Sequence, residues 1–245
     1  MMRLKVSFFA AIAAAAIFIP CVSLAQTQQP APQAPPPPAA QTPAGPSSSV
    51  PYSPGNPLSG VRYDNRFDLT VGLAYDHMKA GPTLLQGSNL GGLDVSGSYW
   101  FAKHWGAEGS GRAYVGTSGT APNPYNIQGP FVAQYFFVGG PEWLGPHNEH
   151  GDLTAHALFG GVYGKFEQDL RGQSPSVVDF YNDQLAPAAI IGGHIDLNRS
   201  PRWVFRITPD AVITHYSINY APSTTQWDVN FAISVGVEYK FKRLR

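Results

Sequence analysis

QWDVNFAISVGVEYKF, residues 226–241, is the stretch that decides the fold of this chain. Every second residue from Trp227 onward is apolar or aromatic, and the residues between them are polar or small. A period of two places alternate side chains on opposite faces of a β-strand. A strand of this length with one wholly apolar face is typical of a membrane-spanning strand, which needs roughly 9–11 tilted residues to cross the bilayer core.

The end of this stretch carries a short motif. The segment Ser234-Val235-Gly236-Val237-Glu238-Tyr239-Lys240-Phe241 resembles the C-terminal insertion signal of outer-membrane barrels, with Ser234, Gly236, Tyr239 and Phe241 at the specified positions. The resemblance implies that the barrel-assembly machinery recognises this strand during insertion. The basic tail, residues 242–245, departs from the family pattern, which usually stops at the aromatic residue.

The N-terminus predicts export. Arg3 and Lys5 precede an apolar run, and Ser23-Leu24-Ala25 fits a small-x-small cleavage site. We therefore expect residues 1–25 to be a signal peptide and the mature chain to start at Gln26. The one cysteine leaves with this segment, which predicts a mature chain without disulfides or thiolate sites. The formal net charge of zero gives no argument for nucleic acid as a partner.

Residues 26–61 are expected to be a disordered periplasmic linker. They contain no Asp, Glu, Lys or Arg and hold 11 of the 23 prolines of the chain. Such a composition cannot bury a core and favours extended polyproline II. A docking site for a periplasmic partner or for the cell wall is the alternative, although no specific motif supports it.

The remaining residues, 62–245, predict an all-β domain. Seven segments before the last strand show strand patterns, near residues 67–75, 93–101, 105–115, 127–138, 153–166, 186–197 and 203–217. Long and short connections alternate between them, which predicts an eight-stranded antiparallel transmembrane β-barrel with both termini in the periplasm. The alternation is unclear in the fourth and fifth segments. The connection 139–151 is too long for this pattern, so either Gly140-Pro141 is a bulge in a longer strand or the turn is irregular.

Large aromatic residues lie near the expected strand ends, which predicts two girdles at the membrane interfaces. The periplasmic girdle would contain Phe101, Trp105, Trp143, Trp203, Tyr239 and Phe241, and the outer girdle Tyr75, Tyr114, Tyr163, Tyr216 and Trp227.

The span from Phe67 to Phe241 also resembles a known family. Four short segments carry the resemblance: 140–143 (GPEW), 156–161 (HALFGG), 192–196 (GGHID), and Arg206 followed by Asp210. They are similar to the outer membrane protein β-barrel superfamily of OmpA/OmpX type, as in small acidobacterial barrels. The resemblance implies this fold and an outer-membrane location among lipid and lipopolysaccharide. It implies no chemistry.

Charged residues are expected inside the barrel. Strand parity turns a set of them inward: Asp94, Glu108, Arg112, His194, Asp196, Arg206, Asp210 and Glu238. Buried charges are costly unless they are paired, and an eight-stranded barrel is only wide enough for side chains to fill it. We therefore expect a sealed interior of ion pairs, with a narrow pore lined by these groups as the alternative.

One constellation suggests catalysis. His215 and Ser217 lie two residues apart, hence on one strand face, and are similar to the His-x-Ser of outer-membrane lipid A 3-O-deacylases. That chemistry needs an acid to orient the histidine, and Asp228 is the nearest candidate, although its parity points inward. The family's asparagine after the serine is replaced by Ile218.

The sequence predicts no cofactor and no metal site. His147-Asn148-Glu149-His150 resembles a metal-binding pair only loosely and is expected to be solvated in a turn. The predicted function is a structural or surface-contact role, in membrane integrity or adhesion through the outer loops. A narrow passive channel and an esterase acting through His215 and Ser217 are the alternatives.

Overall fold

The computed structural model describes residues 55–84, 86–219 and 225–241, which belong to one compact unit. The expected signal peptide, residues 26–54 of the expected linker and the basic tail lie outside the described residues. The described chain forms β1 (Phe67–Met78), β2 (Ser88–Trp100), β3 (Trp105–Thr117), β4 (Phe131–His147), β5 (Gly151–Lys165), η1 (Pro175–Val177), β6 (Gln184–Gly192), β7 (Ile195–Asn198), β8 (Trp203–Ser217) and β9 (Thr225–Lys240). No helix within these ranges is long and apolar enough to cross a membrane.

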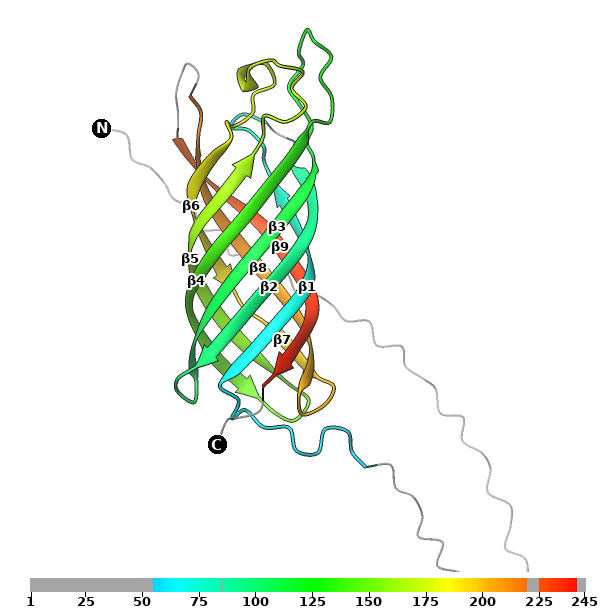
Figure 1. Ribbon diagram of the computed structural model, residues 1–245, viewed down its shortest axis with the longest axis vertical. Helices are drawn as coiled ribbons and strands as arrows, with labels where there is room; N and C mark the ends of the chain where they lie inside the picture. Colours follow the sequence, from blue (N-terminus) through cyan, green and yellow to red (C-terminus); the bar gives the residue numbers. More distant parts are fainter. Residues whose placement is uncertain (1–54, 85, 220–224, 242–245) are drawn as a thin grey trace, which may run out of the picture. The chain divides into compact units, whose positions relative to one another are not determined.

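The strands pair in an antiparallel ring (Figure 1). β1 pairs with β2 on one edge and with β9 on the other, and the pairing runs onward through β3, β4 and β5 and through β8. β6 and β7 both pair with β5 and with β8 in unchanged register, so they form a single wall strand interrupted at Gly193 and His194. The ring therefore has eight walls, which confirms the predicted antiparallel barrel.

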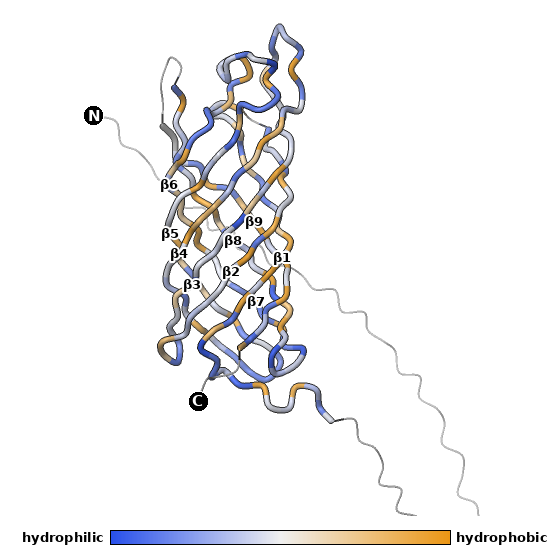
Figure 2. Tube along the Cα trace, viewed as in Figure 1, coloured by the Kyte–Doolittle hydropathy of each residue, from blue (hydrophilic) through white to orange (hydrophobic). Residues whose placement is uncertain are grey.

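Alternate residues of each wall face outward and inward. Outward side chains such as Leu73 and Phe137 are apolar and more than 70 % exposed, whereas inward Asp94 and Arg206 are 4 % and 2 % exposed. Figure 2 shows hydrophobic residues recurring along the strands. An apolar exterior around a polar interior is the reverse of a water-soluble protein, and it is stable where hydrocarbon surrounds the wall. The structure is thus a transmembrane β-barrel.

The two ends of the barrel differ. Short turns at 101–104, 148–150 and 199–202 lie at the end where β1 begins and β9 finishes. Phe241 donates a backbone hydrogen bond of 3.0 Å to the Phe67 carbonyl there. Longer connections lie at the opposite end, as Figure 1 shows. The predicted alternation of long and short connections is therefore present.

Three of the long connections are tied together, and we call residues 79–84, 118–130 and 166–183 the loop crown. Backbone bonds join Tyr181 to Ala80 (2.9 Å) and Ala121 to Val178 (3.4 Å). Asp179 accepts a bond of 3.0 Å from the Thr83 amide and another from its hydroxyl. The crown is therefore a hydrogen-bonded structure and not three independent loops.

An apolar core fills the barrel interior beneath the crown. Its largest members are fully buried: Tyr114, Phe136, Phe166, Phe180, Tyr181 and Tyr216. Their rings contact one another, with centroids 5.1 Å apart for Phe166 and Tyr216 and 5.2 Å for Tyr181 and Tyr216. The placement of Tyr114 and Tyr216 in an outer aromatic girdle is wrong, because both point inward into this core.

The other expected girdle residues follow their parity. Outward aromatic side chains at the two ends are exposed: Phe101, Trp105, Trp143, Trp203 and Phe241 at the short-turn end, and Tyr75, Tyr163 and Trp227 at the crown end.

The uncertainty about strand four is also resolved. β4 runs through Gly140 and Pro141, and its register against β5 shifts later, between Leu144 and His147.

Candidate functional site

The candidate site is the polar half of the barrel interior, between the apolar core and the short turns. Three groups of inward side chains build it, organised by Arg206, by Arg112 and by a pair of histidines.

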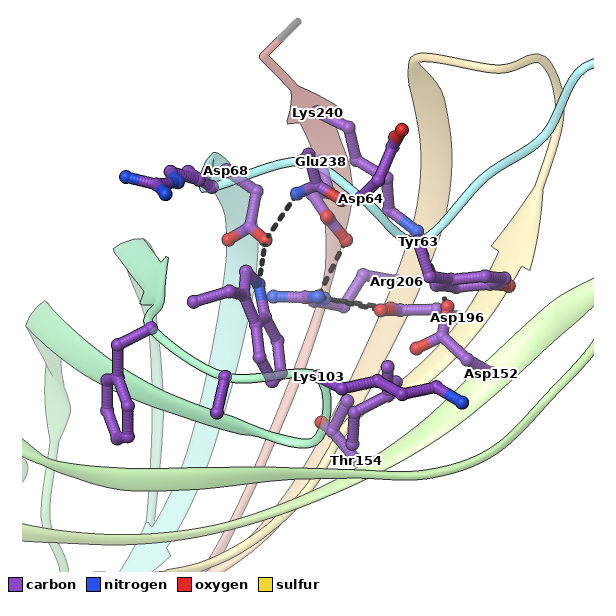
Figure 3. Close-up of a pocket in the computed structure, with 16 residues that line it drawn as sticks. Tyr63, Asp64, Asp68, Lys103, Asp152, Thr154, Asp196, Arg206, Glu238 and Lys240 are labelled. Atoms are coloured by element: carbon purple, nitrogen blue, oxygen red, sulfur yellow. Dashed lines mark hydrogen bonds and ion pairs between the residues drawn. The ribbon is translucent and has the colours of Figure 1, made fainter. Parts of the chain in front are cut away.

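Arg206, on β8, organises the first group (Figure 3). Its guanidinium donates two bonds to Asp196, of 2.8 and 2.6 Å, and one of 2.6 Å to Glu238. The guanidinium also donates a bond of 3.1 Å to the hydroxyl of Thr70 on β1. These bonds hold β7, β8, β9 and β1 together from the inside, in the bidentate geometry that favours arginine over lysine.

Arg112, on β3, organises the second group. It donates to Asp210 at 2.5 Å and lies 3.5 Å from Asp94. Ser234 on β9 completes the coordination of Asp94 with a hydroxyl bond of 2.9 Å. Because β3 and β8 belong to opposite walls, the Arg112–Asp210 bond crosses the lumen and closes it at this level.

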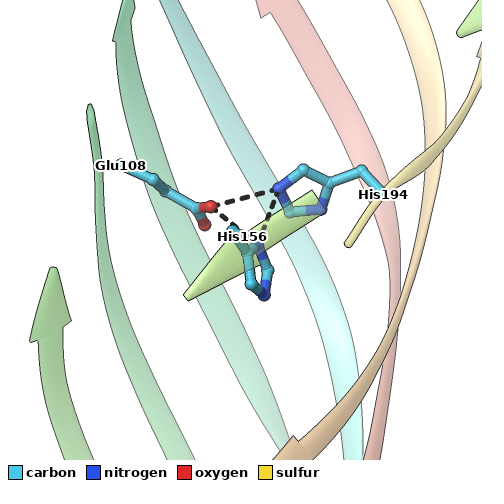
Figure 4. A group of neighbouring side chains, drawn as sticks. All are labelled: Glu108, His156 and His194. Atoms are coloured by element: carbon cyan, nitrogen blue, oxygen red, sulfur yellow. Dashed lines mark hydrogen bonds and ion pairs between the residues drawn. The ribbon is translucent and has the colours of Figure 1, made fainter. Parts of the chain in front are cut away.

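Two histidines form the third group (Figure 4). His156 on β5 lies 2.9 Å from Glu108 through Nδ1 and 3.0 Å from Asp210 through Nε2. His194, between β6 and β7, lies 3.2 Å from the same Glu108 oxygen. Glu108, His156 and His194 are all buried and present ligand-type atoms within 4.8 Å of one another.

A cavity of about 360 Å³ opens at the short-turn end, below the Arg206 group (Figure 3). The segment before β1 covers part of it through Tyr63, whose hydroxyl donates to the Asn148 carbonyl and accepts from Asn198, both at 2.8 Å. Burial and the nearby Asp152 carboxylate raise the pKa of the Tyr63 phenol above its ordinary value. Tyr63 therefore remains neutral, and the Lys240 ammonium lies 4.5 Å from its ring centroid.

All eight residues of the predicted inward set are buried. The structure brings Arg206 together with Asp196 and Glu238, and Arg112 with Asp94 and Asp210. Glu108 faces the two histidines and, in the part of the chain that the structure describes, forms no ion pair with an arginine.

The three candidate catalytic residues are not brought together. The His215 ring packs on Trp227 on the outer face, with centroids 4.3 Å apart. The Ser217 hydroxyl donates to Gln184 at 2.9 Å, and Asp228 faces inward, where it accepts a bond of 2.5 Å from Tyr181. Each member thus has a different partner, and among the described residues no hydrogen bond links the histidine to the serine or the acid.

The residues of the predicted insertion signal have structural contacts of their own. Ser234 bonds Asp94, as described above, and the Tyr239 ring packs between Trp203 and Phe241, with centroids 4.9 and 5.0 Å away. Gly236 lies against Gly72 where β9 meets β1 and closes the ring. A Cβ on Gly236 would lie 2.5 Å from the Val71 carbonyl oxygen.

The polar interior also includes residues outside the predicted inward set, among them Glu142, Asp152, His156 and Lys240. Glu142 and His156 lie directly opposite one another on β4 and β5, the strands whose alternation is unclear. Asp152 lies just after residues 139–151, for which the sequence predicted a connection and not a strand. Inward parity on β9 could have found Lys240, which shares its face with Glu238.

No protein-family model and no curated protein sequence matches the chain. Solved structures do match. Ail, the attachment invasion locus protein of Yersinia pestis, is 20 % identical, with 72 % of this chain and 99 % of Ail covered and a TM-score of 0.45. OprG from Pseudomonas aeruginosa is 16 % identical, with coverages of 75 % and 99 % and a TM-score of 0.48. Neisserial surface protein A is 14 % identical, with coverages of 71 % and 97 % and a TM-score of 0.43. These neighbours are small outer-membrane β-barrel proteins, the superfamily that the sequence resembles.

Proposed function

We propose that this protein is a sealed outer-membrane barrel whose loop crown makes contacts at the cell surface. The observation that carries the proposal is the filled interior. Tyr114, Phe136 and Tyr216 are fully buried in the crown half, and the Arg112–Asp210 bond crosses the lumen of the other half. A barrel filled in this way has no water-filled path for solutes, so its function is expected to lie at its surfaces.

The crown supports a role in contact because its geometry is held before any partner arrives. Ordered loops lose less conformational entropy on binding than free loops do. Residues 118–130 carry no Asp, Glu, Lys or Arg, and a hollow of about 430 Å³ lies along this loop. Tyr125 is 48 % exposed beside it. Such a surface favours an uncharged polar partner.

The proposed orientation places the crown outside the cell and both termini in the periplasm. Export would remove residues 1–25, and the assembly machinery would then read the Ser234–Phe241 strand. The proline-rich arm would remain in the periplasm, where it could reach the cell wall. N-terminal sequencing of outer-membrane fractions should find Gln26, whereas Met1 or recovery in the soluble fraction would contradict this route.

The two alternative functions have less support. A passive channel would require the apolar core and the ion pairs to part. An esterase would require His215 to leave Trp227 and reach Ser217, whose hydroxyl bonds Gln184.

Attachment of cells tests the contact role. A bacterial strain that lacks the gene is given back either the wild-type gene or a variant in which Pro124, Tyr125 and Gln128 are changed to serine. All three are exposed residues of the crown. The matched control changes exposed Lys103 and Arg199 to serine in the short turns at the other end. We expect attachment to glycan-coated surfaces to fall to background in the crown variant and to be retained in the control. Equal attachment by the wild type, the crown variant and empty cells would contradict the proposal.

A further inference from the structure

Four inward residues approach one another in the short-turn half of the interior. Glu108 comes from β3, Glu142 from β4, His156 from β5, and His194 from the junction of β6 and β7, so four neighbouring walls each contribute one side chain. Register explains the convergence. Glu142 pairs directly with His156, and His194 exchanges backbone bonds of 3.0 and 3.2 Å with Thr154, two residues before His156. We propose that Glu108, Glu142, His156 and His194 form a binding site for a divalent transition metal ion, with zinc as the best fit.

The spacing of three of the ligand atoms fits zinc, with Glu142 beside His194 as the fourth ligand. His156 Nδ1 and His194 Nε2 lie 2.9 and 3.2 Å from Glu108 Oε2 and 3.3 Å from one another. Glu142 Oε1 lies 3.6 Å from His194 Nε2. A tetrahedral zinc ion bonded at about 2.0–2.1 Å holds its ligand atoms about 3.3 Å apart. Figure 4 shows the two rings and the Glu108 carboxylate turned toward a common centre.

The second contacts of the histidines orient them for this role. Asp210 Oδ1 lies 3.0 Å from His156 Nε2 and can only accept, so His156 carries its proton on Nε2 and turns Nδ1 toward the site. Thr208 Oγ1 lies 2.9 Å from His194 Nδ1, which leaves Nε2 directed at the site. Metal-ligating histidines generally hold their other ring nitrogen against a carboxylate, carbonyl or hydroxyl in this way.

Carboxylate oxygens without hydrogen bonds lie where a bound cation would contact them. Among the described residues, no donor gives a hydrogen bond to either Glu142 oxygen or to Glu108 Oε1, although Glu142 and Glu108 are 0 % and 3 % exposed. Buried acceptors without partners are costly. Within the described residues, the buried lysine and arginine side chains are Arg112, Arg206 and Lys240. The buried carboxylates number ten: Asp68, Asp76, Asp94, Glu108, Glu142, Asp152, Asp196, Asp210, Asp228 and Glu238. A divalent ion would offset part of this negative charge at the point where the unpaired oxygens lie.

A cavity lies next to the proposed site. The cavity of about 360 Å³ opens at the short-turn end, and Thr154, whose backbone bonds His194, is among its lining residues. In the proposed orientation an ion would enter from the periplasm. This inference is independent of the contact role of the crown, because it concerns the opposite half of the barrel.

Zinc titration of the refolded full-length barrel tests the proposal. The protein, stripped with a chelator in detergent micelles, is titrated with zinc chloride in a calorimeter, and X-ray absorption reports the ligand shell. We expect one zinc ion per chain, nitrogen and oxygen ligands at about 2.0 Å, and a thermal midpoint that rises with zinc concentration. Glu142→Gln keeps the shape of the side chain and should weaken binding at least tenfold, as should His194→Ala if it folds.

The matched control removes His147 and His150, the exposed pair beside the short turn, by alanine substitution. Zinc binding should persist in this control with unchanged stoichiometry. The proposal is overturned if binding is lost in the control, if Glu142→Gln binds zinc as the wild type does, or if the wild type binds none. It is equally overturned if nitrogen NMR of the zinc-treated protein shows both His156 and His194 doubly protonated, since the cluster would then be an ion-paired imidazolium group.

Discussion

At the scale of single residues, the stability of this barrel depends on a few buried charges. Arg206 is 2 % exposed and makes three charge-assisted bonds to Asp196 and Glu238. Buried charges are stabilised by their partners and not by water. Deletion of one member of an ion pair therefore leaves the other charge unpaired in a medium that solvates it poorly.

Arg206→Ala should therefore lower the free energy of unfolding by about 3–5 kcal/mol. Arg199→Ala is the control, because Arg199 is exposed in a short turn and should change stability by about 0.5 kcal/mol or less. Equilibrium unfolding in urea from lipid vesicles measures both values. A loss for Arg206→Ala no larger than that of the control would mean that water already solvates the interior charges.

Much of this network could be predicted from parity, but its pairing could not. Period-two counting turns Arg206 and Glu238 inward, and the structure brings them together. Parity says nothing about which walls meet across the lumen, so the assignment of Asp210 to Arg112, and of Glu108 to two histidines, needed three dimensions. Tyr181 could not be placed at all, since it reaches the interior from a loop.

At the scale of elements, the seam between β1 and β9 closes the barrel. Gly72 and Gly236 pair across it, and a Cβ on Gly236 would meet the Gly72 Cα at 2.7 Å and the Val71 oxygen at 2.5 Å. Both contacts are to backbone, so a side chain there requires the two strands to move apart. The glycine of the predicted insertion signal thus has a packing reason in the folded barrel.

Gly236→Ala should destabilise the barrel by about 1–3 kcal/mol through this overpacking. Gly109→Ala on β3 is the matched control, because a Cβ there would meet nothing within 4 Å. Refolding of the purified protein into vesicles, without assembly machinery, separates packing from recognition. If Gly236→Ala refolded with wild-type stability, the glycine would serve the machinery alone.

The outward face of each strand is predicted to contact lipid. Leu73→Arg, at the middle of β1, should cost about 2–4 kcal/mol, whereas Phe67→Arg at its first residue should cost about 0–1 kcal/mol. Charge is expelled most strongly from the bilayer centre, which is why depth and not side-chain size sets the difference. Vesicle unfolding titrations would contradict this assignment if the two costs were equal or reversed.

The pattern of individual strands explains which parts of the fold the sequence could predict. β1 and β9 alternate cleanly because their inward residues are mostly polar or small. β4 places Val132, Phe136 and Val138 inward, into the apolar core, while its outward face is also apolar. A strand that is hydrophobic on both faces loses its period-two signal, and for this reason the facing of β4 and β5 required the structure.

At the scale of the whole molecule, the interior is divided into an apolar core beneath the crown and a charged half toward the short turns. The core excludes water because aromatic and aliphatic side chains fill it, and the charged half is bridged from wall to wall by Arg112 and Asp210. The strand residues of both halves follow from inward parity, whereas Phe166, Phe180 and Tyr181 enter the core from the crown. We infer that the barrel is closed to solutes.

Conductance in planar lipid bilayers tests this claim most directly. Refolded wild-type protein would be added to one chamber in 1 M salt, with protease protection of co-reconstituted vesicles showing that it inserts. We expect no sustained current steps across a range of applied voltages, because the apolar core and the Arg112–Asp210 bond fill the lumen of the described barrel. Stable, reproducible steps from inserted wild-type protein would contradict the account and show that its charged residues line an open pore.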